Sequence, residues 1–210
     1  MRKMSLRIVY SDEWLIVLDK PSGLLAVPGL GPENQDNLAS RVQQEYPGAR
    51  VVHRLDRDTS GLIIFALDPQ AQRHLSRQFH DRLVEKTYYA VVRGCPEHDS
   101  GQIELPMRKD FEHPPRHRVD LAVGRAAVTR WRVCQRHPDR TRVELTPLTG
   151  RSHQLRLHMQ QLGHPILGDK LYATEETLAL ADRLLLHAAR LGLEHPSTGA
   201  RISLTSECPF

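Results

Sequence analysis

The chain reads HRLDRDTSGLIIFAL from His53 to Leu67, a polar segment followed by an apolar one. Its second half, 61–67, is a continuous apolar run of strand length, which is typical of a strand covered on both faces of a sheet. Its first half is polar and places Asp56 between two arginines, just before a turn sequence. We therefore expect Asp56 to lie immediately before a rigid, buried strand.

Segments of strand and helix character surround this stretch. Paired runs of alternating residues predict antiparallel strands, Asp68-Pro69 marks a helix start, and 96–115 is expected to be an exposed loop with at most one short strand. The expected strands are 6–10, 14–19, 61–67, 86–92, 102–105, 126–135, 141–145, 184–193 and 200–206, and the expected helices follow Asp36, Asp68 and Ser152. The sequence therefore predicts an α+β fold in a single domain, 1–210, whose mixed, mainly antiparallel sheet is flanked by helices and loops.

Positive charge is concentrated in one part of the chain. The net charge is +4 and the isoelectric point is near 9.1. Between Arg108 and Arg142 there are ten Lys or Arg against four Asp or Glu. Because guanidinium groups match phosphate oxygens, this segment favours a polyanionic partner, although a solvated basic face would give the same pattern.

Nothing in the sequence indicates export or membrane insertion. Asp12 and Glu13 interrupt the amino-terminal region before a long apolar stretch develops, and the run 14–18 is far shorter than the roughly 20 residues that cross a bilayer. The three cysteines are widely separated and form no Cys-x-x-Cys pair, which indicates a reducing compartment. We expect a cytoplasmic protein.

Asp56 is the first candidate for chemistry. Arg54 and Arg57 stabilise a charged carboxylate between them, and the strand that follows fixes its position, which suits a nucleophile or a base. A turn aspartate in a surface ion pair has the same local sequence. The residues near Asp56 leave both interpretations open.

The longer pattern resembles the RluA-type pseudouridine synthase family. The segment 53–62 resembles its HRLDxxTSGL signature, and 17–24 resembles its amino-terminal motif, with Asp19 where asparagine is usual. Tyr88 lies in a segment similar to the family's tyrosine motif. The carboxy-terminal motifs are similar to the segments 149–158, 163–169 and 184–188.

The resemblance implies a role for each matching residue. Asp56 would act on the sugar of a uridine as the bond between C1′ and N1 breaks, and Tyr88 would stack on the uracil. Arg156 would pair with Asp56 and hold its carboxylate charged and oriented. Because uracil leaves and rejoins the same sugar, no cofactor and no metal is required. A water-poor pocket is needed to avoid hydrolysis.

The resemblance also implies an RNA partner. A stacked base must leave its stack to reach Asp56, and Arg54 is expected to fill the vacated space. The expected RNA contacts are Arg54, Arg116, Arg118, Arg130, Arg151 and His153. Because an S4-type domain would have no room before Val17, we expect a catalytic domain alone. The short form, the segment 27–29 and the ending 183–188 resemble the family members that act on a large-subunit rRNA loop and the tRNA anticodon stem-loop, so we expect both of these targets or one of them. We expect no membrane and no obligate protein partner.

Two alternatives belong to other classes. Twelve histidines, including His153, His158 and His164, raise the possibility of a metal-dependent hydrolase, but a spacing of five residues between the first two does not match a His-Glu-x-x-His helix. The second alternative is a noncatalytic RNA-binding protein. The presence of all three expected catalytic residues argues against it.

Overall fold

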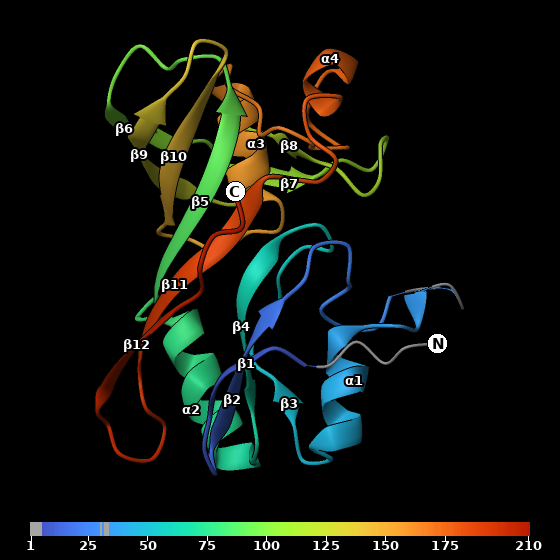
Figure 1. Cartoon of the computed structure of the whole chain (residues 1–210), viewed down its shortest axis with the longest axis vertical. Helices are drawn as coiled ribbons and strands as arrows, with labels where there is room; N and C mark the ends of the chain where they lie inside the picture. The colour runs from blue at the N-terminus through green and yellow to red at the C-terminus, as the bar shows by residue number, and fades with distance from the viewer. Residues whose placement is uncertain (1–5, 30, 32–33) are drawn as a thin grey trace. The chain divides into compact units, whose positions relative to one another are not determined.

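A computed structural model describes residues 6–29, 31 and 34–210, so the amino-terminal residues 1–5 lie outside the described chain. The chain forms two compact units (Figure 1). The first contains residues 1–86 and 188–209, and the second contains 87–187 and 210. The chain passes from the first unit to the second within β5 (Glu85–Arg93) and returns within β11 (Leu186–Glu194).

The first unit is built on antiparallel strands. β2 pairs with β1 and β4, β3 pairs with β4, and β12 pairs with β11, all in antiparallel register. The elements are β1 (Ile8–Ser11), β2 (Leu15–Lys20), α1 (Leu38–Glu45), β3 (Arg50–Val51), β4 (Ser60–Ala66), α2 (Pro69–His80) and β12 (Arg201–Thr205).

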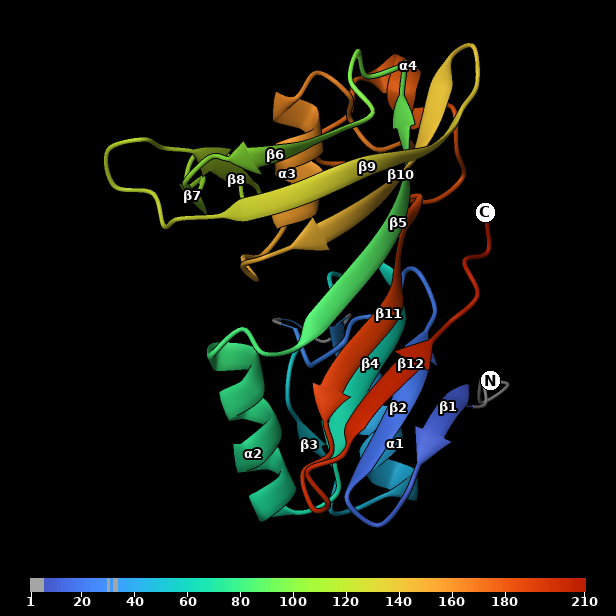
Figure 2. The same ribbon diagram turned by 90° about the vertical axis from the view of Figure 1, so that its left-hand side faces the viewer.

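The core of the first unit covers both faces of β2 and β4. All residues of both strands are buried. One set of alternating residues, including Leu62 and Ile64, packs in a cluster with Leu75 of α2, and α1 lies on the other side of the strands (Figures 1 and 2). The prediction of a strand covered on both faces after Asp56 is therefore confirmed.

Gly61, at the start of β4, is required by a close backbone approach. It has a φ of +108°, and a Cβ atom there would lie 2.3 Å from the carbonyl oxygen of Ala188. No other residue type fits that space without moving the backbone. The strand that follows the Asp56 loop is thereby packed directly on its neighbour.

The second unit has an antiparallel sheet in the order β5-β10-β9-β6, with α3 against one face (Figure 2). A separate two-stranded hairpin, β7–β8, lies beside it. The remaining elements are β6 (Ser100–Glu104), β7 (Met107–Lys109), β8 (His117–Val119), β9 (Val128–Arg136), β10 (Arg140–Pro147), α3 (Gln154–Gln161) and α4 (Glu175–Leu178).

Alternation along the strands separates a core face from an outer face in the second unit. Val143 and Leu145 of β10 are fully buried and pack with Met159 of α3. On β9, Arg130 and Arg132 alternate with buried residues and are exposed. The arginines of this strand therefore point away from the core, as their alternation with apolar residues predicts.

The α+β class with mainly antiparallel pairing is confirmed, and two local expectations are wrong. The cap of α1 is Asn37, whose side chain accepts a hydrogen bond from the amide of Ser40, whereas Asp36 forms a bidentate ion pair with Arg41. The segment 96–115 contains β7 in addition to β6, so it is not a loop with one strand. Among the described residues, no helix is long and apolar enough to cross a membrane.

Candidate active site

Asp56 lies on a short loop of the first unit between β3 and β4. It is half-buried, next to Leu55, which is 6% exposed, while Arg54 and Arg57 on either side are exposed. Thr59 and Ser60, which lead into β4, are buried. The loop therefore keeps Asp56 at the surface of the core and presents Arg54 to solvent.

Lys20 stabilises this loop through hydrogen bonds to the backbone. Its side chain is 0% exposed, and its ammonium donates hydrogen bonds to the carbonyl oxygens of Pro21, Leu24 and Arg57 at 2.9, 2.7 and 2.9 Å. A buried ammonium is stable only where such acceptors replace its water. One cation therefore joins the turn after β2 to the residue that follows Asp56.

Further hydrogen bonds join the same two segments. The amide of Gly23 donates to the carbonyl of Arg57 at 3.0 Å, and the guanidinium of Arg57 donates back to the carbonyl of Gly23 at 3.1 Å. The hydroxyl of Ser22 donates to the carbonyl of Asp58 at 2.6 Å. The backbone on the carboxyl side of Asp56 is thus held in a single position by the amino-terminal turn.

His53 fixes the other side of the loop. Its ring stacks on Phe79 of α2 with centroids 4.3 Å apart, and its Nε2 accepts the amide hydrogen of Ile64 at 3.0 Å. Burial, together with the positive charge of Lys86, lowers the pKa of His53 to about 3. The imidazole is therefore neutral near pH 7 and acts as a packed hydrogen-bond acceptor.

Arg156 is the charged centre of the second unit. Its guanidinium forms a bidentate pair with Asp169, with Nε–Oδ2 at 2.7 Å and Nη2–Oδ1 at 2.6 Å, and the two side chains are 3% and 0% exposed. Asp169 also accepts the amide hydrogens of Leu171 and Tyr172. The fork geometry fixes the plane of the guanidinium.

Tyr172 connects Arg156 to the start of α3 and to the β7–β8 hairpin. The guanidinium carbon of Arg156 lies 5.4 Å from the centroid of the Tyr172 ring. The Tyr172 hydroxyl accepts the amide hydrogen of His117 at 2.8 Å and lies 2.9 Å from Nδ1 of His153. His153 itself has a φ of +57°, which is rare for a residue with a side chain. Arg156, His153 and Tyr172 therefore form one cluster within this unit.

The turn before α3 is built by Gln154. Its amide oxygen accepts hydrogen bonds from the Thr149 hydroxyl at 2.6 Å and from the Arg151 amide at 3.1 Å. Its amide nitrogen donates to Thr129 and to the carbonyl of Val128 on β9. This buried glutamine explains how the segment 149–156 brings His153 and Arg156 to the same place.

The other predicted site residues lie on different elements of the second unit. Tyr88 is half-buried on β5 and packs against the core of the sheet. Arg116 and Arg118 are exposed at the β7–β8 hairpin, and Arg130 is exposed on β9, where its Nε donates to Gln102. The Nε of Arg151 donates to the carbonyl of Ala126 at 3.2 Å.

Asp56 and Arg54 belong to the first unit, whereas Tyr88 and Arg156 belong to the second. The predicted pairing of Arg156 with Asp56 therefore stays a prediction. Sequence reasoning missed Lys20, Asp169 and Tyr172 as supports of the site. The available signal for Lys20 was a lysine at the end of a strand that begins with four apolar residues, because such a charge requires specific partners if the strand is buried.

The histidines that suggested a metal site have separate protein partners. His158 is buried between the Thr129 hydroxyl and the carbonyl of Leu105, and Nδ1 of His164 lies 2.8 Å from the carbonyl of Arg93. Within the described residues, the group with clustered ligand atoms is Asp110, Glu112 and His113, where Nδ1 of His113 lies 3.1 Å from the Asp110 carboxylate. Hydrogen bonding within an exposed loop accounts for that group.

Comparison with known proteins decides the family. Residues 14–161 match the family described as RNA pseudouridylate synthase. The chain belongs to this family. The match includes Asp56, Tyr88 and Arg156, while Asp169 and Tyr172 lie beyond it.

Individual relatives place this synthase in the RluA type. It is 48% identical over 206 residues to the dual-specificity RNA pseudouridine synthase RluA of Haemophilus influenzae, covering 98% of this chain and 94% of the relative. It is 46% identical over 204 residues to the RluA protein of Escherichia coli, covering 97% and 93%. Among solved structures, human RNA pseudouridylate synthase domain containing 1 matches with a TM-score of 0.82 at 28% identity, covering 100% of this chain and 87% of that one. The chain is therefore an RluA-type enzyme, an isomerase that acts on RNA, and neither a metal-dependent hydrolase nor a noncatalytic binding protein.

Proposed function

We propose that this enzyme converts a uridine to pseudouridine in a large-subunit rRNA loop and in the tRNA anticodon stem-loop, with Asp56 as the catalytic carboxylate. The observation that carries the assignment is the bracing of the Asp56 loop by the buried ammonium of Lys20. Such bracing suits a carboxylate that must be held at the sugar of an extruded nucleotide. The RluA relatives are dual-specificity RNA pseudouridine synthases, which supports two RNA targets, and the family resemblance implies which two they are.

The reaction is an isomerisation, so no atom is gained or lost. Asp56 acts at the sugar, either by attack at C1′ or by removing a sugar proton, as the C1′–N1 bond breaks. The uracil turns, C5 bonds to C1′, and the proton on C5 leaves while N1 gains one. Tyr88 provides the face on which the detached uracil stacks, and Arg156, oriented by Asp169, pairs with the Asp56 carboxylate.

RNA binding is assigned to the exposed cations. Arg54 stands beside Asp56 and is exposed, which suits insertion into the stack that the uridine leaves. Arg116, Arg118 and Arg130 contact the flanking phosphates, and Arg151 and His153 contact the nucleotides near Arg156. The two units act together as one catalytic domain in the cytoplasm, where the three free cysteines stay reduced.

Replacement of Asp56 tests the assignment. Asp56→Asn retains the size of the side chain but loses its negative charge, so we expect a folded protein that binds RNA and whose product falls by about 10³-fold or more. The measurement is tritium release from C5-labelled uridine in an anticodon stem-loop and in an rRNA fragment. Asp58→Asn is the matched control, since Asp58 lies two residues away on the same loop and contributes its backbone carbonyl to the bracing. Appreciable product from Asp56→Asn, or an equal loss from Asp58→Asn, contradicts the role of Asp56.

A further inference from the structure

The loop that joins β7 and β8 presents an aromatic ring to solvent. Phe111 is 79% exposed, although a phenyl ring is ordinarily among the more buried side chains. Figure 1 shows this loop projecting away from α3. An isolated exposed apolar residue is common on protein surfaces, so exposure alone does not indicate a function. Three further observations indicate that the Phe111 ring has one.

First, the loop is held in shape by its own hydrogen bonds. The amide of Asp110 donates to the carbonyl of Arg116 at 2.9 Å, and the amide of Arg116 donates to the carbonyl of His113 at 2.9 Å. The Asp110 carboxylate accepts the amide hydrogen of Glu112 at 3.1 Å, and its side chain is only 14% exposed. Phe111 therefore stays in solvent because the turn is closed beneath it, and little ordering is needed when a partner binds.

Second, exposed cations precede and follow the loop that carries Phe111. Lys109 precedes the loop and Arg116 follows it, and both are exposed, as is Arg118 on β8. Arg116 forms no ion pair with a carboxylate in the described part of the chain, and it is therefore available to a phosphate. An exposed aromatic ring between cations is the arrangement with which proteins bind unpaired nucleotides, because the ring stacks on a base while the cations neutralise the backbone.

Third, the loop begins at the cluster around Arg156. Lys109 and His117 are register partners in the hairpin, and the amide of His117 donates to Tyr172, whose ring lies against Arg156. Phe111 follows this register pair by two residues, in the loop beyond the end of β7. The hairpin therefore connects the loop that carries Phe111 to the cluster at which the RNA is proposed to lie.

We propose that Phe111 is a stacking platform for an unpaired base next to the target uridine, with Arg116 holding the adjoining phosphate. The inference rests on the proposed function, because it requires that RNA lie at the Arg156 cluster. It adds a specificity-determining contact: a substrate in a loop supplies an unpaired base, whereas a continuous duplex does not.

The test compares aromatic, aliphatic and truncated side chains at position 111. Equilibrium binding is measured with an anticodon stem-loop that carries 2-aminopurine at each loop position next to the target. Stacking on an aromatic ring contributes an amount that corresponds to about a 5- to 150-fold change in affinity. We expect that loss, with loss of 2-aminopurine quenching, for Phe111→Ala and Phe111→Leu, and near wild-type behaviour for Phe111→Trp.

Two controls separate stacking from other causes. Leu121 is 80% exposed in the turn after β8, so Leu121→Ala removes equally exposed apolar surface from the same region and is expected to leave affinity within twofold. Arg116→Ala is expected to reduce the slope of log affinity against log salt by about one phosphate contact, while Phe111→Ala leaves that slope unchanged.

The outcomes are distinguishable. Wild-type affinity in Phe111→Ala, equal losses in Phe111→Ala and Leu121→Ala, or full rescue by Phe111→Leu overturns the stacking contact while leaving the isomerase assignment intact. Failure of the wild-type chain to bind or modify any of these RNAs overturns the proposed function, and the stacking contact with it.

Discussion

Asp169 offers a demanding test of how the second unit holds Arg156. Asp169→Asn retains the shape of the side chain and an oxygen that accepts the amides of Leu171 and Tyr172, but it removes the negative charge opposite Arg156. The guanidinium then remains 3% exposed without the negative charge of Asp169, and one of its two hydrogen bonds to that side chain, at 2.7 and 2.6 Å, meets an NH₂ group. The variant therefore tests the charge of Asp169 and its hydrogen bonds from Arg156 without changing how the side chain packs.

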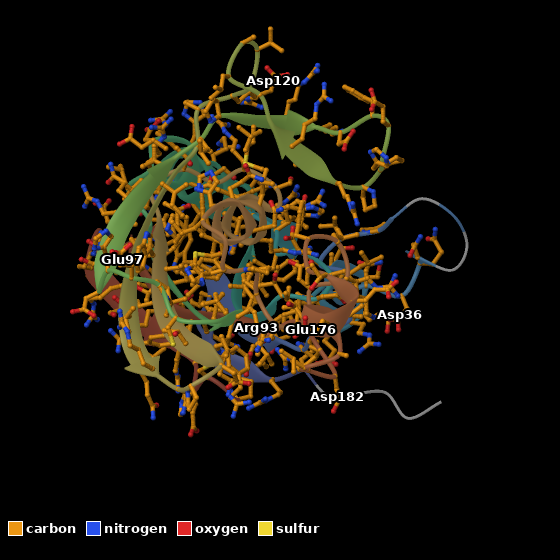
Figure 3. All side chains as sticks on the ribbon, turned by 90° about the horizontal axis from the view of Figure 1, so that it is seen from above. Asp36, Arg93, Glu97, Asp120, Glu176 and Asp182 are labelled. Atoms are coloured by element: carbon orange, nitrogen blue, oxygen red, sulfur yellow. The ribbon has the colours of Figure 1, made fainter. Side chains whose placement is uncertain are left out.

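The burial of the pair sets the magnitude. Removal of one partner from a buried ion pair costs about 3–5 kcal/mol, because the remaining charge loses its hydrogen-bonded counter-ion where water does not replace it. The exposed pair Arg93–Glu176, with a distance of 2.8 Å and Glu176 75% exposed, is the matched control in the same unit (Figure 3). Glu176→Gln is expected to change the free energy of unfolding by less than about 1 kcal/mol.

Urea unfolding measures the stability of both variants, and initial rates on a stem-loop RNA measure function at a temperature where both are folded. We expect Asp169→Asn to lower kcat by at least about tenfold with little change in KM. A shifted Arg156 guanidinium would no longer orient Asp56, its proposed partner in catalysis, but it would keep its positive charge. If Asp169→Asn is as stable and as active as Glu176→Gln, the reasoning that Asp169 orients Arg156 is wrong.

Two further predictions follow from the first unit. Lys20→Met removes the ammonium donor from the carbonyls of Pro21, Leu24 and Arg57 and is expected to cost about 2–4 kcal/mol in urea unfolding and to lower kcat on RNA. An unchanged kcat in folded Lys20→Met would show that Lys20 does not act on the Asp56 loop. Burial would raise the pKa of Asp12, but hydrogen bonds from Tyr10, from the amides of Leu15 and Trp14, and from His195 outweigh it and lower that pKa to about 2. Because the folded-state pKa lies below the unfolded value of 3.8, Asp12 stabilises the fold above about pH 4, and this contribution is lost as the pH falls through about 2. After allowance for its partial exposure, about 1–2 kcal/mol should separate wild type from Asp12→Asn at pH 6 and disappear near pH 2, and a difference that does not vary with pH contradicts the assignment.

Features determined by neighbouring residues were predictable from the sequence. Asp68 caps α2 as expected, since an aspartate before a proline at the first helical position satisfies the amides of Gln70 and Ala71 locally. The run 61–67 identified β4 because a strand covered on both faces has no polar alternation. At α1 the local signal was ambiguous, because Asp36 and Asn37 both have capping side chains; in the structure Asn37 caps the helix and Asp36 pairs with Arg41.

Features determined by distant residues were not predictable. The β7–β8 hairpin has strands of three residues, too short to show alternation, and its position depends on the hydrogen bond between His117 and Tyr172, 55 residues apart. Arg156 stood out through the family motif, but its partner Asp169 is 13 residues away, beyond any helical spacing. Lys20 and Arg57 are 37 residues apart, and only the folded chain brings them together.

The charges of this enzyme fall into two groups that respond differently to salt. Lys20 and the Arg156–Asp169 pair are desolvated, with exposed fractions between 0% and 3%, so mobile ions approach them poorly. Arg54, Arg116, Arg118 and Arg130 are exposed, so salt would screen the phosphate contacts that we propose for them. We therefore expect added salt to weaken RNA binding well before it disturbs the hydrogen bonds of Lys20 and of the Arg156–Asp169 pair, because those groups are out of reach of mobile ions.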